Sequence, residues 1–313
     1  MFFALAILAC TGNDDEQTDS GGSDTADSAE DAEVIPVWEQ HRIETSSTLY
    51  GVYASGAGVY VVGDGGYAWS GGADDDWAYM SIDVDDANLT DLWGQGQNDD
   101  TILAASTNDG KVAQYAGGTW TTGSLDDTSA LEAVGGSSSS ALYAVGFGRA
   151  WYYDGATWTY EALPGNERLN DVYAEGSSAI AVGDAGDCAL RRDGAWSACD
   201  TGTELDLNGV AGTSADDVYA VGAAGLVLHW DGSSWRDLEA PTSDTDTLWA
   251  VFVPEEGVAV VVGSNGLALK YANGDWESLP TGVDNALYSI HGVSSSNFWA
   301  GGNRGMMLHY KSE

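Results

Sequence analysis

The sequence predicts an all-β protein: a seven-bladed β-propeller of four-stranded antiparallel blades, closed by an N-terminal strand that joins the last blade. Three observations support this fold class. A repeat of about forty residues fills most of the chain, a Trp recurs once in each repeat, and the first and last repeats are incomplete in complementary ways. Tandem repeats of this length are typical of propellers and solenoids, and the incomplete ends distinguish between the two.

The repeat is clearest in the C-terminal half, where the block that begins at residue 207 reads LNGVAGTSADDVYAVGAAGLVLHWDGSSWRDLEA. It contains four short runs of β-forming residues separated by Gly and Asp, which predicts four strands per repeat. Four strands form one twisted sheet that cannot bury both of its faces alone. Packing such sheets around an axis buries the faces and leaves only short, protected edges.

The Trp that follows the last turn of each repeat gives the number of blades. It recurs at Trp38, Trp77, Trp120, Trp158, Trp196, Trp235 and Trp276. An opening L-x-x-(V/L/I) motif also recurs seven times, beginning at Leu49, Leu89, Leu131, Leu169, Leu207, Leu248 and Leu287. We expect the Trp to be a core or inter-blade residue, with an exposed glycan-stacking Trp as the alternative.

The two series are out of step at the ends of the chain. Trp38 precedes the first opening motif, and the last block, LYSIHGVSSSNFWAGGNRGMMLHY, has no Trp after it. Residues near Trp38 are therefore expected to supply the fourth strand of the last blade, beside a strand near Leu308. A solenoid would instead require polar caps. The propeller is assigned to residues 34–313.

The repeat resembles those of secreted lipoproteins of myxobacteria and their relatives, through the motif VYAVG-x-x-G-x-x-L-H-(Y/W)-D-G-x-x-W. It is also similar to kelch repeats. The turns Asp154-Gly-Ala-Thr-Trp158 and Asp231-Gly-Ser-Ser-Trp235 resemble a degenerate Asp-box, the turn of sialidases and photosystem-assembly propellers. The resemblance covers residues 34–313 and implies the fold, because propellers carry many unrelated activities.

The N-terminus resembles a lipoprotein signal. Residues 1–10, MFFALAILAC, form an apolar run too short to span a bilayer, and Ile7-Leu8-Ala9-Cys10 resembles a lipobox, which implies lipidation of Cys10. An ordinary secretory signal or a buried segment is the alternative. Residues 11–33 carry nine acids, no base and no aromatic residue, so we expect a disordered acidic linker. This layout is typical of an outer-membrane or cell-surface lipoprotein, with a periplasmic or secreted protein as the alternative.

The charge restricts the possible partners. The chain has 49 acidic and 10 basic residues and a formal net charge of −39. It offers no basic stripe to displace counterions from phosphates, which argues against nucleic acid. The same charge argues against docking on anionic headgroups, so the membrane should be contacted only through the lipid anchor. We expect a monomer that binds a protein or a glycan.

Acidic loops suggest where such a ligand would bind. In a propeller, the loops between blades share one face with the loops that join the second and third strands. That candidate binding face comprises Asp64, Asp83, Asp85, Asp86, Asp126, Asp127, Asp184, Asp187, Asp206, Asp244, Asp246 and Asp284. It would attract cations or basic partners, and a merely solvated loop surface is the alternative. No cofactor is expected; calcium would suit clustered Asp, but no segment matches a calcium-loop motif.

We expect a binding module and not an enzyme, because no catalytic or metal-binding motif is recognisable. His229 and His309 fall in one repeat slot, filled elsewhere by Lys270 and Arg191, which predicts an outward face and no metal site. The opening strands also lack the Arg residues with which a sialidase would clamp a carboxylate. One alternative is a polysaccharide hydrolase or lyase that uses carboxylates at the axis, with no pair singled out. The other is an assembly or scaffold factor that resembles the photosystem-assembly propellers.

Two cysteines predict a disulfide. Residues 188–199 read CALRRDGAWSAC, and a hairpin that turns at Asp193-Gly194 places Cys188 directly opposite Cys199. Cysteines in this arrangement on neighbouring strands are close enough to bridge. An exported location would supply the oxidising conditions.

The lipobox assignment leads to a first test. In a host that processes lipoproteins, the chain should incorporate labelled palmitate, and Cys10→Ala should abolish the label because the lipid is attached at that residue. The label is measured on the purified protein, and Cys188→Ala serves as the control that retains it. Undiminished labelling of Cys10→Ala would contradict the assignment.

Overall fold

The computed structural model describes residues 37–96, 101–125, 129–165 and 168–312. The chain divides into two units, Met1–Val34 and Ile35–Glu313, and all of the described residues belong to the second. Cys10, the expected linker 11–33, and two acids of the expected binding face, Asp126 and Asp127, lie outside the described residues. Within the described ranges, no helix combines the length and apolar character needed to cross a membrane.

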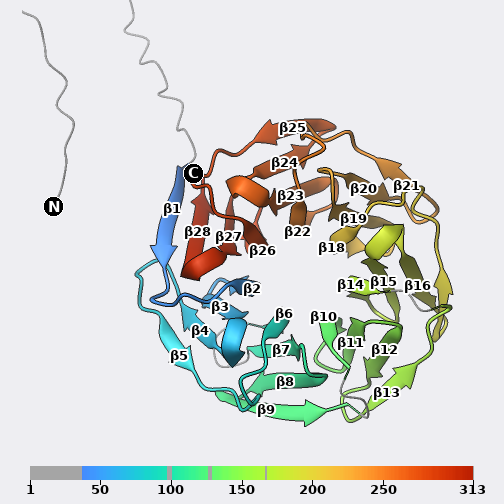
Figure 1. The fold of residues 1–313 in the computed structure, drawn as a ribbon, viewed down its shortest axis with the longest axis horizontal. Coiled ribbons are helices and arrows are strands. Elements are labelled where there is room, and N and C mark those ends of the chain that lie inside the picture. The colour runs from blue at the N-terminus through green and yellow to red at the C-terminus, as the bar shows by residue number, and fades with distance from the viewer. Residues whose placement is uncertain (1–36, 97–100, 126–128, 166–167, 313) are drawn as a thin grey trace, which may run out of the picture. The chain divides into compact units, whose positions relative to one another are not determined.

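The second unit forms seven four-stranded antiparallel sheets around a central axis, which confirms the predicted fold class (Figure 1). Blade one consists of β2 (Leu49–Ser55), β3 (Gly58–Gly63), β4 (Ala68–Gly71) and β5 (Ala78–Met80). Blade two consists of β6 (Leu89–Gln95), β7 (Ile102–Thr107), β8 (Lys111–Ala116) and β9 (Thr119–Ser124). Blade three consists of β10 (Leu131–Ser138), β11 (Ala141–Gly146), β12 (Arg149–Tyr153) and β13 (Trp158–Glu161). Blade four consists of β14 (Leu169–Glu175), β15 (Ser178–Gly183), β16 (Cys188–Arg192) and β17 (Ala195–Ala198). Blade five consists of β18 (Leu207–Ser214), β19 (Asp217–Gly222), β20 (Val227–Trp230) and β21 (Trp235–Asp237). Blade six consists of β22 (Leu248–Glu255), β23 (Val258–Gly263), β24 (Ala268–Ala272) and β25 (Asp275–Ser278). Short 3-10 turns join the second and third strands of several blades, namely η1 (Asp64–Gly66), η3 (Asp184–Gly186), η4 (Ser264–Gly266) and η5 (Asn303–Gly305).

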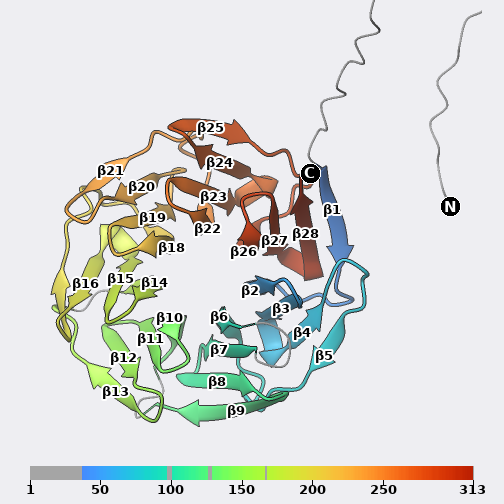
Figure 2. The ribbon, with the colours of Figure 1, turned by 180° about the vertical axis from the view of Figure 1, so that it is seen from behind.

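The seventh blade joins the two ends of the described chain. It consists of β26 (Leu287–Ser294), β27 (Asn297–Gly302), β28 (Met306–Lys311) and, outermost, β1 (Val37–Arg42). β1 is antiparallel to β28, with Trp38 opposite Tyr310 and Gln40 opposite Leu308. The predicted closure of the ring is confirmed, and both views show β1 at the rim beside β28 (Figure 2).

The opening leucine of each repeat lies where neighbouring blades pack together. All seven have 0% of their surface exposed, namely Leu49, Leu89, Leu131, Leu169, Leu207, Leu248 and Leu287. Leu89, for example, belongs to a cluster that also contains Val62 and Ala68 of the preceding blade. A Gly ends the second strand in every blade except the second, where β7 ends at Thr107. This Gly is fixed by close packing, since a Cβ at Gly183 would collide with the carbonyl oxygen of Arg168. The repeated motif therefore records the packing between blades.

The repeat tryptophans are structural. All seven are buried or half-buried, and Trp38 packs edge-on against Phe298 at a centroid distance of 5.4 Å. Trp38 donates its Nε1–H to the carbonyl of Leu279 in the preceding blade at 3.3 Å, and Trp276 donates to the carbonyl of Leu238 at 3.0 Å. The inter-blade interpretation is confirmed, and the exposed glycan-stacking alternative is not supported at this position.

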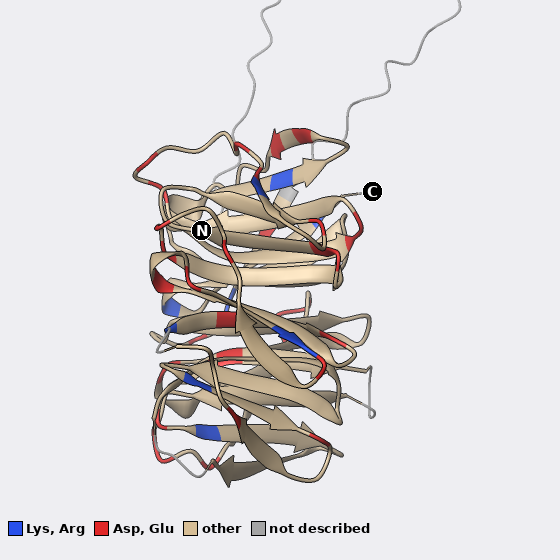
Figure 3. Cartoon of the chain, turned by 90° about the vertical axis from the view of Figure 1, so that its right-hand side faces the viewer, with Lys and Arg blue, Asp and Glu red and all other residues tan. Residues whose placement is uncertain are grey.

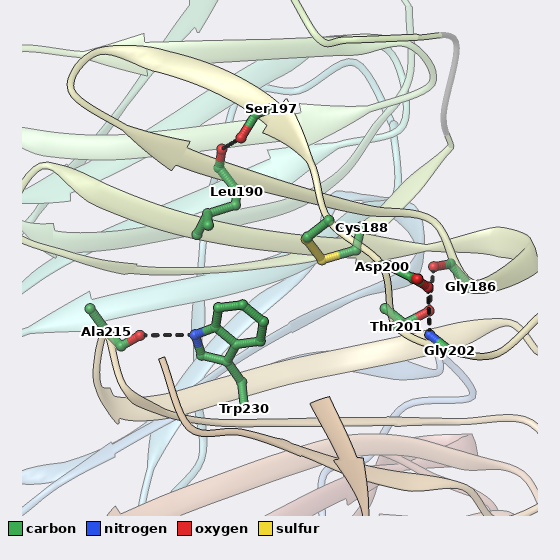
Figure 4. The surroundings of a disulfide bond; sticks show 10 residues. Gly186, Cys188, Leu190, Ser197, Asp200, Thr201, Gly202, Ala215 and Trp230 are labelled. Carbon is green, nitrogen blue, oxygen red and sulfur yellow. Dashed lines mark hydrogen bonds between the residues drawn. A yellow bond between two sulfur atoms is a disulfide. The ribbon is translucent and has the colours of Figure 1, made fainter. Parts of the chain in front are cut away.

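The predicted disulfide is present in blade four, where Cys188 and Cys199 are bonded with their Cα atoms 5.1 Å apart (Figure 4). The N–H of Cys199 donates to the carbonyl of Cys188 at 2.9 Å, which continues the ladder of β16 and β17. Asp193 and Gly194 both have positive φ, 51° and 82°, as a two-residue hairpin of this kind requires. The symmetry of the hairpin was therefore sufficient to predict the bridge.

The closure leads to a second test. Deleting residues 34–46 removes β1, which leaves β28 as an unpaired edge and exposes its apolar neighbours, so the variant should aggregate and unfold at a lower temperature. Size-exclusion chromatography and thermal unfolding measure both effects. Deleting residues 11–23 is a control of equal length that leaves β1 in place. A monomeric 34–46 deletion of unchanged stability would contradict this closure.

Candidate functional site at the axial cavity

Every inner strand carries a β-bulge at the same place. In all seven blades, the register shifts between the opening leucine and the residue two positions later, as between Leu49 and Gly51 in β2 or Leu248 and Ala250 in β22. A bulge leaves one residue unpaired and redirects its side chain. The seven residues so placed form what we call the bulge ring: Tyr50, Thr90, Glu132, Asn170, Asn208, Trp249 and Tyr288.

The bulge ring surrounds the mouth of a cavity on the axis. The inner strands of all seven blades line an axial cavity of about 330 Å³, which is within the range typical of ligand sites. A second hollow of about 580 Å³ lies at its mouth and is bordered by all seven members of the ring. The ring therefore controls what can enter the axial cavity from this face.

One side of the ring is aromatic. Trp249, Tyr288 and Tyr50 come from three consecutive blades, the sixth, seventh and first, and we call them the aromatic arc. The ring centroids of Trp249 and Tyr288 are 5.4 Å apart, and those of Tyr288 and Tyr50 are 5.8 Å apart. All three side chains are half-buried. The arc is a continuous, partly exposed apolar surface at the cavity mouth.

The other side of the ring is polar and serves the fold. Thr90 and Asn208 each donate a hydrogen bond to the opening-leucine carbonyl of the next blade, at 3.1 and 2.9 Å, and Asn170 does the same at 2.9 Å. Glu132 accepts a hydrogen bond from the Arg168 guanidinium at 3.0 Å. The polar members are thus held by inter-blade bonds, which leaves the aromatic arc as the part of the ring most available to a ligand.

Two carboxylates lie deeper in the axial cavity. Asp91 accepts backbone N–H bonds from Leu92 at 2.7 Å and from Val134 of the next blade at 3.0 Å. Asp171 accepts the equivalent bonds from Val172 and Val210, both at 2.7 Å. Each carboxylate therefore connects two blades from a position on the cavity wall.

The pKa values of both carboxylates are raised. Burial among protein atoms raises the pKa of Asp91, because desolvation outweighs its two N–H bonds. Burial also raises the pKa of Asp171, and the nearby charge of Asp91 raises it further. Both side chains border the cavity and keep part of their surface exposed. They are the acids at the axis that the sequence left unspecified.

A neutral histidine completes the cavity wall. Burial lowers the pKa of His291 to about 4, and its ring lies 4.9 Å from that of Tyr53 and 5.4 Å from that of Phe252. The backbone N–H of Ala54 donates to its Nδ1 at 3.1 Å. The imidazole is therefore uncharged near neutral pH and adds no positive charge beside the two carboxylates.

The twelve acids of the expected binding face are distributed around the ring. Of the ten that the structure describes, only Asp184 and Asp206 border the cavity mouth. Several connect their loop to a neighbouring segment: Asp206 accepts the N–H of Ala185 in η3 at 2.8 Å, and Asp85 pairs with Lys111 of β8 at 2.9 Å. In the part of the chain that the structure describes, no three of these acids approach closely enough to share a cation.

Acidic residues are also present on the opposite face. The loops between third and fourth strands carry Asp74, Asp75, Asp76, Asp154, Asp193 and Asp231, and acidic residues lie along both edges of the ring in side view (Figure 3). The negative charge is therefore not specific to one face, and the aromatic arc distinguishes the cavity mouth better than charge does.

The sequence predicts that His229, His309, Lys270 and Arg191 occupy the same position of the repeat. This prediction is wrong for Arg191. Arg191 pairs with Ala179, as Tyr310 pairs with Phe298, so Arg191 corresponds to Tyr310 and the residue before it occupies the histidine slot. A slip of one residue moves a side chain to the other face of a strand. Arg191 is 5% exposed and forms two hydrogen bonds to the Glu161 carboxylate, at 2.6 and 2.7 Å.

The expected outward orientation was also wrong for His309. Its side chain is 6% exposed and stacks on Trp299 with ring centroids 4.1 Å apart, because β1 and the first blade cover this side of β28. Burial lowers the pKa of His309.

The bulge ring could have been recognised in the sequence, although it was not. Its members directly follow the opening leucine, which is identical in all seven repeats, yet the ring contains five different residue types. Strong variation in the residue that follows an invariant core leucine indicates that this variable residue does not serve packing. What the sequence does not reveal is the bulge, which directs that side chain to the cavity mouth.

Comparisons with known proteins support the fold. No protein-family model matches the sequence. The chain is similar to Immune protein Tsi7 of Pseudomonas aeruginosa, with 31% identity over 104 residues. The match covers 30% of this chain and 33% of that protein, so it spans about a third of the length of the curated relative.

The solved structures that are similar share the architecture at low identity. A catalytically inactive virginiamycin B lyase from Staphylococcus aureus with quinupristin superposes with a TM-score of 0.77 and 12% identity, over 88% of this chain and 100% of that one. YCF48 bound to a D1 peptide superposes with a TM-score of 0.72 and 15% identity, over 91% and 100%. At these identities the likeness establishes the propeller fold alone.

The carboxylate pair leads to a third test. The pKa of Asp171 is higher in the folded state than in the unfolded state. Ionisation of Asp171 therefore lowers the free energy of unfolding as the pH rises above about 4. Asp171→Asn cannot titrate, but it leaves one of two backbone donors without an acceptor. Its stability deficit relative to wild type should therefore be largest near pH 5 and should shrink toward pH 8, by at most about 1.4 kcal/mol per pH unit.

Urea unfolding followed by Trp fluorescence measures this difference. Asp216→Asn changes an exposed acid on the opposite face and is the control, which should keep a constant difference from wild type. A stability deficit of Asp171→Asn that is independent of pH would contradict the raised pKa of Asp171.

Proposed function

We propose that the propeller is a protein-binding module whose partner is held at the cavity mouth by the aromatic arc of Trp249, Tyr288 and Tyr50. The observation that carries this proposal is the arrangement of the arc, because three neighbouring bulges direct aromatic side chains toward one opening. Trp and Tyr are the residues most often found at the energetic centre of protein interfaces. An extended segment of the partner would lie across the arc and project a side chain into the axial cavity.

The charge of the chain indicates the chemistry of that segment. With a net charge of −39, the protein would attract basic partners over a distance and accelerate their encounter. Arg or Lys side chains also bind favourably over the faces of Trp and Tyr. A basic, extended peptide segment therefore suits both the arc and the surrounding field.

The comparisons are consistent with a protein partner. The curated relative is named an immune protein, and one propeller of similar fold is described in complex with a peptide. These similarities also keep open the assembly or scaffold role expected from the sequence, which would use the same peptide-binding mouth. A glycan is the alternative ligand, since aromatic faces also stack on sugars.

We also propose that the protein is an exported lipoprotein, anchored through Cys10 at the outer membrane or cell surface. The disulfide between Cys188 and Cys199 supports this, because such bonds persist in oxidising compartments. A membrane anchor followed by the acidic segment 11–33 would hold the propeller where it can meet partners outside the cytoplasm.

A second candidate function is polysaccharide hydrolysis or elimination by Asp91 and Asp171. The observation in its favour is that two carboxylates of raised pKa share one cavity wall, an environment in which one group can hold a proton while the other is ionised. Their four backbone hydrogen bonds also explain them as connections between blades. Release of reducing ends from a polysaccharide panel, lost in Asp171→Asn, would favour the enzyme.

The binding proposal leads to a fourth test. The purified chain is screened on a peptide array of graded basicity and on a glycan array, and the affinity of the strongest ligand is then measured for variants. Trp249→Ala should lower that affinity by about 2 kcal/mol, or roughly thirtyfold, as expected for a central interface aromatic. If the ligand is basic, the affinity should also fall as salt is added.

Tyr160→Ala is the matched control, because Tyr160 is an aromatic residue that is 52% exposed on the outer strand β13. It should bind as the wild type does. Equal loss in both variants, or no loss in Trp249→Ala, would exclude the aromatic arc as the binding site. Selective binding to the glycan array would replace the peptide with a sugar.

A further inference from the structure

Ring closure brings together three side chains from opposite ends of the chain. Glu39 and His41 are two residues apart on β1 and therefore point to the same side, and Glu39 lies directly opposite His309 of β28. One ligand atom from each of Glu39, His41 and His309 lies within 4.8 Å of the other two. Glu39 Oε2 is 3.9 Å from His41 Nε2 and 3.7 Å from His309 Nδ1.

The two imidazole nitrogens in this group make no hydrogen bond within the described part of the chain. His41 and His309 are each 6% exposed, and His41 Nε2 and His309 Nδ1 are buried without a hydrogen bond to any described residue. Buried polar atoms are nearly always satisfied, and exceptions call for an explanation such as a bound ion. Here two such atoms lie within 4 Å of the same carboxylate oxygen.

The opposite nitrogen of each ring is held by an oxygen. His41 Nδ1 is 2.8 Å from Asp75 Oδ1, and His309 Nε2 is 2.9 Å from Asn297 Oδ1. An oxygen acceptor favours the tautomer with its proton on the contacted nitrogen, which leaves the lone pair on the other nitrogen, the one that faces Glu39. Metal-binding histidines are typically oriented by such a second contact to a carboxylate or carbonyl oxygen.

We propose that His41 Nε2, His309 Nδ1 and Glu39 Oε2 form a site for a divalent transition metal of the zinc class at the seam of the ring. Two imidazoles and one carboxylate are a ligand set that zinc accepts. Bond lengths of 2.0–2.1 Å would bring the ligand atoms to about 3.4 Å from one another. That spacing is reached by small side-chain movements, mainly of Glu39, which is 59% exposed.

A fourth ligand position would be open. A hollow of about 340 Å³ adjoins the group and is lined by His309, Asn297, Trp299, Asp74 and Asp76. Zinc sites with three protein ligands generally complete their coordination with water or an external group. The proposed site could therefore bind a further small ligand from this hollow, on the face opposite the cavity mouth.

Blade five contains a natural comparison. His229 occupies the same slot as His309, and its Nε2 contacts Asp217 as His309 Nε2 contacts Asn297. The residue opposite His229, however, is Arg236, where β1 supplies Glu39. A guanidinium would repel a cation, so the two slots differ in the feature that the proposal requires.

The test uses the full chain without a polyhistidine tag, in an excess of Mg²⁺ that occupies the weak carboxylate sites. Calorimetric titration with Zn²⁺ should detect one tight site per chain, and Co²⁺ should give the intense visible absorption of a four-coordinate site. His309→Gln should abolish both signals, whereas His229→Gln should retain them. Weak, multiple binding that is unaffected by His309→Gln would overturn the proposal.

Two further variants guard against loss of folding in His309→Gln. Glu39 and Asp75 are both 59% exposed, so Glu39→Gln and Asp75→Asn should fold normally, as circular dichroism can verify. Asp75→Asn should weaken Zn²⁺ binding by about 10- to 100-fold, the effect typical of residues that orient a ligand, and Glu39→Gln should weaken it at least as much. Unchanged affinity in both folded variants would overturn the proposal.

Discussion

The pairing of β1 with β28 is the interaction on which the ring depends. Each blade buries its faces against its neighbours, so the first and last blades must meet before the apolar clusters on either side of the seventh blade are complete. The cluster around Trp38 contains residues of blades six and seven, and the next one joins blade seven to blade one through Trp299 and Leu49. Without β1, one edge of the last blade would lose its hydrogen-bond partner and two clusters would be opened to water.

The bulge in each inner strand separates two functions that are adjacent in sequence. The opening leucine is the same in every blade and fully buried, while the next residue is of five different types among the seven blades and faces the cavity mouth. A strand without the bulge would place alternate residues on opposite faces of the sheet. Because the bulge removes one residue from this alternation, the ring can vary in chemistry while the packing between blades is unchanged.

Most of the fold could be predicted from the sequence because the repeat reports local and inter-blade packing directly. The blade number, the closure near Trp38 and the disulfide each follow from counting positions. The site could be predicted only in part. The acidic loops are visible in the sequence, but the role of Asp91 and Asp171 depends on their burial at the axis, which no spacing reveals.

The remaining differences also have physical causes. Arg191 was assigned to the wrong slot because the repeat was aligned by residue type, whereas the strand register shifts it by one position. His41 and His309 could not be associated from their positions in the sequence, since only closure of the ring makes them neighbours. Contacts of this kind depend on the topology and not on any local pattern.

The aromatic arc has a mechanical consequence because of where it lies. Its three members belong to blades six, seven and one, so the arc crosses the blade that β1 and β26–β28 assemble from opposite ends of the described chain. A molecule held by all three would connect the two sides of that junction. Separation of the ends would then require release of the molecule, so occupancy of the mouth and resistance to opening are thermodynamically linked.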